Sequence, residues 1–266
     1  MAGIDITNKP LTLGRGQILL AKTPAGTHVD TNSFRYVGNT PEFTINFEET
    51  ALDHYSSDFG IKEKDESVTL EVNRTGSFIT DRVSPSNLAL FLLGSASAVT
   101  QAAVASAPET IDGAAVFPGA YIQLGKTASR ITGARGVTVG AVTNVGALTT
   151  YVLDTDYRVI AQTGMIEILP GGAIPEGDDL VVNYAIAAQT RNRIISGNTP
   201  FDGALQYIEA NPVGENRVIL IPRVKLRANG DFTLKSDEWQ QLPFSLEILK
   251  LANYEAVYVD GEPYTP

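Results

Sequence analysis

Three segments of the chain alternate between apolar and polar residues with a period of two. In residues 42–48, Phe43, Ile45 and Phe47 alternate with polar side chains, and residues 67–73 and 244–248 repeat the pattern. This period predicts antiparallel strands with one face on a core and the other in water. We therefore expect Val68, Leu70 and Val72 to face inward. The polar positions expected on the wet face are Glu42, Thr44, Asn46, Glu48, Thr69, Glu71, Asn73 and Glu247.

Further strands are predicted at residues 17–22, 34–37, 205–209 and 217–227. Pro222 lies inside the last of these. Because proline cannot donate a ladder hydrogen bond, we expect an edge or a bulge there. Asn229-Gly230 is a hairpin signal, which predicts a following strand at residues 232–235.

One helix is predicted at residues 85–93. Ser84 is a suitable N-cap and Pro85 suits the first helical position, while Gly94 suits the C-terminal cap. Leu88 and Leu92 supply its apolar stripe.

Residues 48–66 form a long connection between two predicted strands. It holds seven acids and two bases, so its local charge is −5. A connection of this length is usually functional or disordered. It nevertheless carries four large apolar residues, which favours a loop that docks on another surface. The residues expected to make that contact are Leu52, Asp53, Tyr55, Asp58, Phe59, Ile61, Lys62 and Lys64.

The composition changes after Thr100. Residues 101–189 are rich in Ala, Gly, Val and Thr, and residues 102–108 have the composition of a linker. Short predicted strands, separated by turn signals, indicate a small β-sandwich inserted at residues 105–188. The host domain would then comprise residues 1–104 and 189–266. The inserted strands are expected at residues 120–124, 137–139, 157–160, 165–169 and 180–185.

The predicted fold is therefore all-β. The host domain should pack two antiparallel sheets as a sandwich or partial barrel, with one flanking helix and a long loop. The longest apolar run, residues 88–93, is far shorter than the ~20 residues that span a bilayer, so no membrane association is expected.

Composition excludes several kinds of chemistry. The chain has no cysteine, so disulfides and thiolate metal sites are excluded. A net charge of −10 argues against tight nucleic-acid binding. The Asp53-His54-Tyr55-Ser56-Ser57 segment is no catalytic triad, because triad partners meet through tertiary structure. Gly125-Lys126-Thr127 lacks the spacing and the following helix of a phosphate loop. We expect neither catalysis, nor a cofactor, nor a metal.

A basic cluster near residue 225 is opposite in sign to the rest of the chain. It protects an edge strand by charge, or it contacts an acidic surface on a neighbouring copy. We favour the second interpretation, because the same chain carries the acidic segment 48–66. The candidate contact residues are Arg223, Lys225 and Arg227.

Four segments together resemble the major tail tube proteins of long, non-contractile-tailed bacteriophages. They are residues 51–65 (ALDHYSSDFGIKEKD), 84–94 (SPSNLALFLLG), 221–235 (IPRVKLRANGDFTLK) and 242–250 (LPFSLEILK). The resemblance implies hexameric rings that stack into a hollow tail, with one sheet of each subunit joining a barrel around the lumen. It also implies that the long loop reaches the neighbouring ring, and that the inserted sandwich lies on the exterior of the tube.

The resemblance further implies partners and a location. The partners would be other copies of the chain, a tape measure protein, a tail terminator, a distal tail protein, and genomic DNA that passes without specific binding. The location would be the virion tail, assembled in the cytoplasm of the host bacterium. The wet-face acids Glu42, Glu48, Glu71 and Glu247 would repel phosphate.

Two alternatives remain. One is another all-β virion component, such as a capsid, baseplate or adhesion protein. The other is a carbohydrate-active β-sandwich enzyme, which is disfavoured because Trp239 is the only tryptophan available for a sugar platform.

Overall fold

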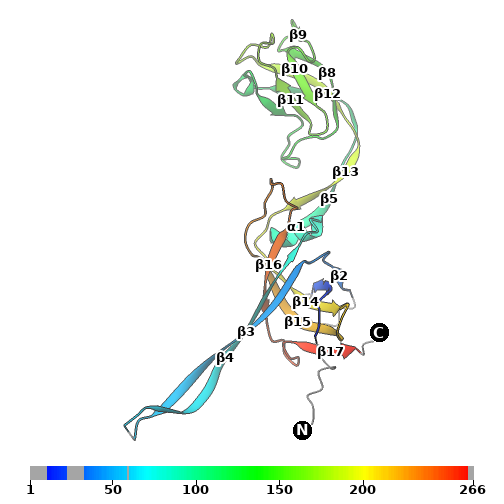
Figure 1. The fold of residues 1–266 in the computed structure, drawn as a ribbon. Coiled ribbons are helices and arrows are strands. Elements are labelled where there is room, and N and C mark those ends of the chain that lie inside the picture. The colour runs from blue at the N-terminus through cyan, green and yellow to red at the C-terminus, as the bar shows by residue number, and fades with distance from the viewer. Residues whose placement is uncertain (1–10, 23–32, 59, 263–266) are drawn as a thin grey trace. The chain divides into compact units, whose positions relative to one another are not determined.

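The computed structural model describes residues 11–22, 33–58 and 60–262. The chain divides into two compact units (Figure 1). Unit 1 comprises Met1–Ala96 and Ile194–Pro266, and unit 2 comprises Ser97–Arg193. The boundaries expected at residues 105 and 188 lie inside unit 2. The all-β class, with antiparallel sheets and one α-helix, is confirmed.

Unit 1 is built on one eight-stranded antiparallel sheet. Its order is β2-β1-β14-β15-β16-β4-β3, and β17 also pairs with β15. The strands are β1 (Gly16–Lys22), β2 (Arg35–Tyr36), β3 (Glu42–Ser56), β4 (Glu63–Thr80), β14 (Phe201–Glu209), β15 (Asn216–Ala228), β16 (Leu242–Ile248) and β17 (Tyr258–Glu262).

The sheet has two halves, one that contains β17 and one that contains β16, and strands β14 and β15 belong to both. The first half of β15 pairs with β17 and the second half with β16. Pro222 lies at the change, opposite a register shift between Gly203 and Leu205, so the predicted bulge is confirmed. Residues from both halves, Ile18 and Phe244 among them, form one core. The two layers that the sequence predicts are therefore two halves of one continuous sheet.

Helix α1 (Pro85–Phe91) packs on this core two residues shorter than predicted. The hydroxyl of Ser84 accepts a hydrogen bond from the Asn87 backbone N–H at 3.2 Å, as expected of an N-cap. The buried side chain of Asn87 donates to the Val37 carbonyl at 2.6 Å, which ties the helix to the segment after β2. At Gly94 a Cβ would lie 1.8 Å from the Ile195 carbonyl oxygen, so only glycine fits there.

The long loop expected at residues 48–66 is wrong. Every residue of β3 pairs with β4, and only residues 57–62 connect the two strands (Figure 1). The pairing contains register shifts at Thr50/Ala51 and at His54/Tyr55. Each shift changes which face of the ribbon a side chain occupies. The strands escaped prediction at residues 48–56 and 63–66 because apolar and polar residues do not alternate there.

The strand expected at residues 232–235 is also absent from the described chain. Residues 229–241 form no strand, and the chain returns to the sheet as β16. Phe232 packs instead against Phe91, with ring centroids 5.9 Å apart, and belongs to the surroundings of the unit 1 core. Its apolar side chain therefore packs against the core although the segment forms no strand.

Unit 2 has a four-stranded sheet, β6-β12-β8-β9, and a three-stranded sheet, β10-β11-β7, around a core that includes Leu124, Ile166 and Leu180. A further pair joins β5 and β13. The expected linker at residues 102–108 is wrong, because most of it lies in β6. The strands are β5 (Ser95–Gln101), β6 (Val104–Ile111), β7 (Tyr121–Gln123), β8 (Val137–Asn144), β9 (Thr150–Tyr151), β10 (Tyr157–Ile160), β11 (Met165–Ile168), β12 (Leu180–Ile186) and β13 (Gln189–Ile195).

Candidate assembly surfaces

One face of the β14-β15-β16-β4-β3 part of the sheet is mostly polar, with Ile79 and Pro243 as apolar members. The residues that alternate with it, such as Phe78, Leu226 and Leu246, are buried in the core. Cross-strand pairs such as Glu48 with Asn73 place neighbouring polar side chains side by side. We call this surface the polar face. Its members include Glu42, Thr44, Asn46, Glu48, Glu71, Asn73, Asp202, Arg223, Lys225, Arg227 and Glu247.

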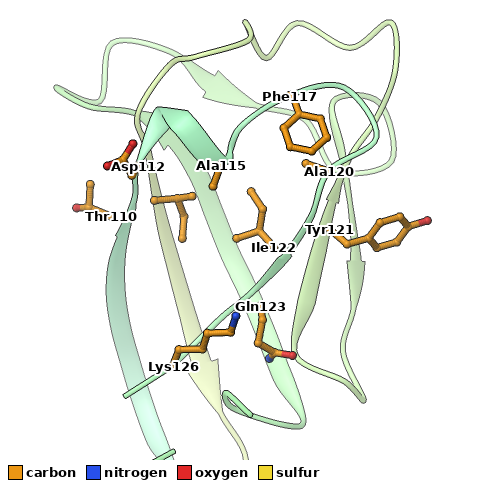
Figure 2. A pocket seen from close by; sticks show the side chains of 10 residues that line it. Thr110, Asp112, Ala115, Phe117, Ala120, Tyr121, Ile122, Gln123 and Lys126 are labelled. Atoms are coloured by element: carbon orange, nitrogen blue, oxygen red, sulfur yellow. The ribbon is translucent and has the colours of Figure 1, made fainter. Parts of the chain in front are cut away.

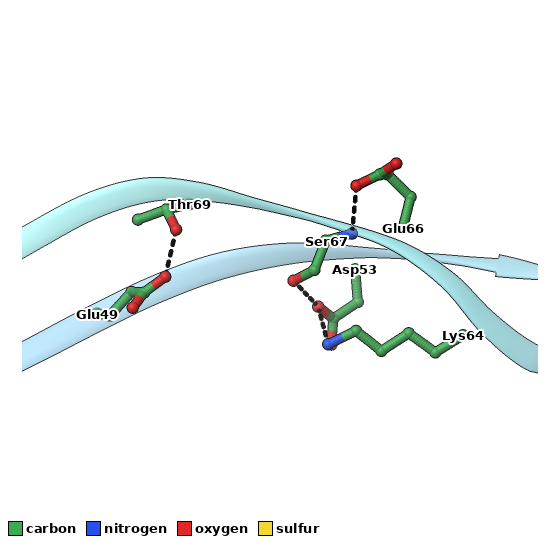
Figure 3. Close-up of polar contacts among 6 residues, drawn as sticks. All are labelled: Glu49, Asp53, Lys64, Glu66, Ser67 and Thr69. Carbon is green, nitrogen blue, oxygen red and sulfur yellow. Dashed lines mark hydrogen bonds and ion pairs between the residues drawn. The ribbon is translucent and has the colours of Figure 1, made fainter.

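Seven of the eight predicted wet-face residues lie on the polar face, and Thr69 does not. The register shift after Thr50 leaves Leu70 without a partner in β3, so Thr69 comes to the opposite side of the ribbon. There its hydroxyl donates a hydrogen bond to the carboxylate of Glu49 (Figure 3). Thr69 therefore does not belong to the polar face.

The basic candidates share the polar face with the acids. Arg223 makes a bidentate pair with Asp202, with nitrogen–oxygen distances of 3.2 and 2.9 Å. Arg227 lies 3.9 Å from Glu247. Hydrogen bonding to Asp202 raises the pKa of Arg223. Sequence reasoning missed Asp202, because its closeness to Arg223 depends on the β14–β15 register.

From Thr75 toward the turn at residues 57–62, strands β3 and β4 pair only with each other in the described chain and form a two-stranded ribbon. We define the ribbon as residues 48–73. Strand β16 pairs with β4 only from Thr75 to Thr80, and within the described chain no strand other than β3 pairs with the rest of β4. The ribbon exposes Leu52, Tyr55, Ile61, Val68, Leu70 and Val72. The expectation that the last three face inward is wrong within one copy of the chain.

Polar contacts cross the ribbon near its tip (Figure 3). Lys64 lies 2.6 Å from Asp53, which also accepts a hydrogen bond from the Ser67 hydroxyl at 2.7 Å. The contact with Lys64, and then that with Ser67, lowers the pKa of Asp53, and the same pair raises the pKa of Lys64. His54 Nδ1 lies 2.6 Å from Asp65 Oδ1.

The predicted contact residues therefore lie mainly on paired strands. Leu52, Asp53 and Tyr55 belong to β3 and Lys64 to β4. Asp58, Ile61 and Lys62 lie in the connection between the strands, and Phe59 lies outside the described residues. These contacts hold two exposed strands in register, and they leave the apolar side chains uncovered.

Unit 2 carries an open pocket of about 410 Å³. Figure 2 shows Asp112 and Lys126 toward opposite ends of it, with Phe117 and Tyr121 on one side. Among the lining residues, Asp112 accepts a hydrogen bond from the Ala114 backbone N–H and the Tyr121 hydroxyl donates to Glu167. In the described part of the chain, no group of three or more His, Asp and Glu side chains is placed to hold a metal ion.

A family model described as "Protein of unknown function UCP028589" matches residues 11–255. No curated protein matches the sequence. Among the described residues, no helix is both long and apolar enough to span a membrane.

Proposed function

The chain belongs to this family of proteins of unknown function, and we propose that it is a structural protein that polymerises into the tail tube of a long, non-contractile-tailed bacteriophage. Copies would form hexameric rings that stack into a hollow tube. The polar face would line the lumen, and the ribbon would contact the adjacent ring. DNA would pass through without specific binding.

The observation that carries this proposal is the ribbon with its uncovered apolar residues. Within the described residues, β3 ends the sheet, and its outer edge is unpaired over all fifteen residues. Long exposed edges that carry apolar side chains pair readily with other chains, and proteins usually shorten or protect them. A protein whose function is polymerisation retains such an edge.

The dimensions of the polar face suit a conduit. Four strands from each of six copies, spaced ~4.8 Å apart, give a circumference of ~115 Å and a diameter of ~37 Å before strand tilt. Closing a barrel across copies also removes the exposed sheet edges. The resulting channel would be wide enough for a DNA duplex.

The charge of the polar face supports passage without retention. It carries five acids against three bases, a net charge of −2 per copy. Because a basic wall would neutralise phosphates, release counterions and hold the DNA, an acidic excess favours free movement. The basic side chains are partly neutralised by Asp202 and Glu247.

Electron microscopy of the purified chain tests the proposal. Rings or long hollow tubes are expected, and a protein that stays monomeric at high concentration contradicts it. A matched variant replaces residues 51–70 with Asn-Gly, because Thr50 and Glu71 are directly opposed and a two-residue turn can join them. This variant should keep its circular dichroism spectrum and lose stacking. Tubes of normal length from it would show that the ribbon is not the contact.

A further inference from the structure

Four arginines gather in unit 2. Arg191 and Arg193 are two residues apart on β13, so they share one side of the strand. Arg130 and Arg135 belong to the segment before β8. We call these four residues the arginine cluster. They form a local concentration of positive charge in a chain whose net charge is −10.

Two nitrogen atoms of the cluster are buried without an acceptor. Arg191 Nη1 and Arg193 Nε have no hydrogen-bond partner in the described structure. Burial lowers the pKa of Arg191, and so do the charges of Arg135, Arg193 and Arg130. A buried guanidinium donor without a partner is costly, and adjacent like charges add to that cost.

The surrounding side chains hold the cluster in place without neutralising it. The buried side chain of Gln101 accepts a hydrogen bond from the backbone N–H of Arg135 at 3.1 Å and donates one to the backbone carbonyl of Arg135 at 2.7 Å. Arg135 Nη1 donates to Gln123 Oε1 at 3.1 Å. These partners are neutral, so they fix the position of Arg135 and leave its charge uncompensated.

One carboxylate of unit 2 shares a neighbour, Tyr184, with Arg130, and it is already engaged. Glu109 accepts hydrogen bonds from the Gly125 N–H at 2.8 Å and from the Tyr184 hydroxyl at 2.7 Å. Burial and Glu109 raise the pKa of Tyr184, and the charge of Arg130 opposes this shift. Glu109 therefore serves the fold, and the guanidinium donors still lack an acceptor.

We propose that the arginine cluster binds a multivalent oxyanion, which accepts hydrogen bonds from Arg191 and Arg193. Planar guanidinium groups match the geometry of phosphate and carboxylate oxygens, and two of them can hold one anion. The anion would supply the missing acceptors and offset the repulsion among the four charges. The observations behind this site all come from unit 2, so they do not depend on the proposed tube.

Calorimetric unfolding of the full chain tests the proposal. Inorganic phosphate, citrate and chloride are titrated separately at constant ionic strength. Phosphate or citrate should raise the unfolding temperature of unit 2 saturably, because a ligand that binds only the folded state stabilises it. A stronger effect of phosphate would identify a phosphoryl ligand, and a stronger effect of citrate a carboxylate ligand. Equal effects of all three salts would overturn the proposal.

Substitutions separate binding from a structural role. Arg191→Gln should weaken the apparent affinity roughly 10-fold or more, because it removes a charge-assisted donor. Without phosphate it should unfold at the same temperature as the wild type or higher, since it removes repulsion. The control is Arg158→Gln, which alters a surface pair with Glu167 at 3.3 Å in the same unit and should leave the phosphate effect unchanged.

Two results of these substitutions would contradict an anion site. One is a phosphate response of Arg191→Gln equal to that of the wild type. The other is an equal loss of stability with and without phosphate, which would show that Arg191 is structural. Should Arg191→Gln fail to fold, the salt titration of the wild-type chain decides alone.

Discussion

Replacing Leu52 and Val68 with threonine should raise the concentration needed for assembly while leaving the single copy folded. The two residues are directly opposed on the ribbon, and they are 63% and 54% exposed. Threonine suits a strand, and in place of valine it keeps the β-branch, so the ribbon itself should persist. Surface substitutions of this kind change the stability of the fold by less than about 0.5 kcal/mol each.

The expected loss follows from the apolar surface that remains to be buried. Full burial of a leucine or valine side chain contributes about 1.5–3 kcal/mol. With roughly half of each side chain still exposed, the pair would contribute about 2–3 kcal/mol to one contact between copies. This corresponds to a roughly 30- to 150-fold weaker association at each contact.

Sedimentation across a concentration series measures this effect as a rise in the concentration needed for tubes to form. Urea unfolding of the dissociated protein checks that the fold is unchanged. Leu148→Thr is the matched control, because Leu148 is 88% exposed but lies in unit 2. Assembly of the double variant at the wild-type concentration would refute the reasoning, as would an equal loss in the control.

Two further predictions concern the units themselves. Phe244→Ala should destabilise unit 1 by about 3–5 kcal/mol in urea unfolding, because Phe244 is 1% exposed and stacks on Phe78 with centroids 5.0 Å apart; a loss below 1 kcal/mol would contradict the assigned core. Backbone N–H donors of Ala173 and Val152 lower the pKa of Asp156 below 3.8, so its contribution is complete above about pH 4 and disappears as the pH falls through the folded-state value. Asp156→Asn should flatten the acid limb of unit 2 thermal unfolding, and an unchanged limb would exclude this role.

The strands of the sheet body could be predicted because one face of each meets a core. Period-two alternation located the start of β3, part of β4 and most of β16, and the further strand signals located β1 and most strands of unit 2. Ser84 and Pro85 likewise marked the start of the helix. These features are local, so the sequence carries them within a few residues.

The ribbon could not be predicted in the same way. Residues 48–56 and 63–66 of its strands do not alternate between apolar and polar residues, and a segment without alternation resembles a loop. The face assigned to Thr69 was wrong because the register shift after Thr50 leaves Leu70 without a partner in β3. The pair between Asp202 and Arg223 depends on a long-range register, which no local pattern contains.

Alternation in the ribbon has a different cause from alternation in the sheet body. Periodicity shows that certain side chains avoid water, and it does not show whether the covering surface belongs to the same chain. In β4 the alternation of apolar and polar residues continues from Thr75 back to residue 67, where β16 no longer pairs with the strand. Val68, Leu70 and Val72 stay exposed there. A two-stranded hairpin by itself is only marginally stable in water. Apolar residues on such a hairpin therefore contribute most when another surface covers them, and a second copy of the chain would do so in an assembled tube.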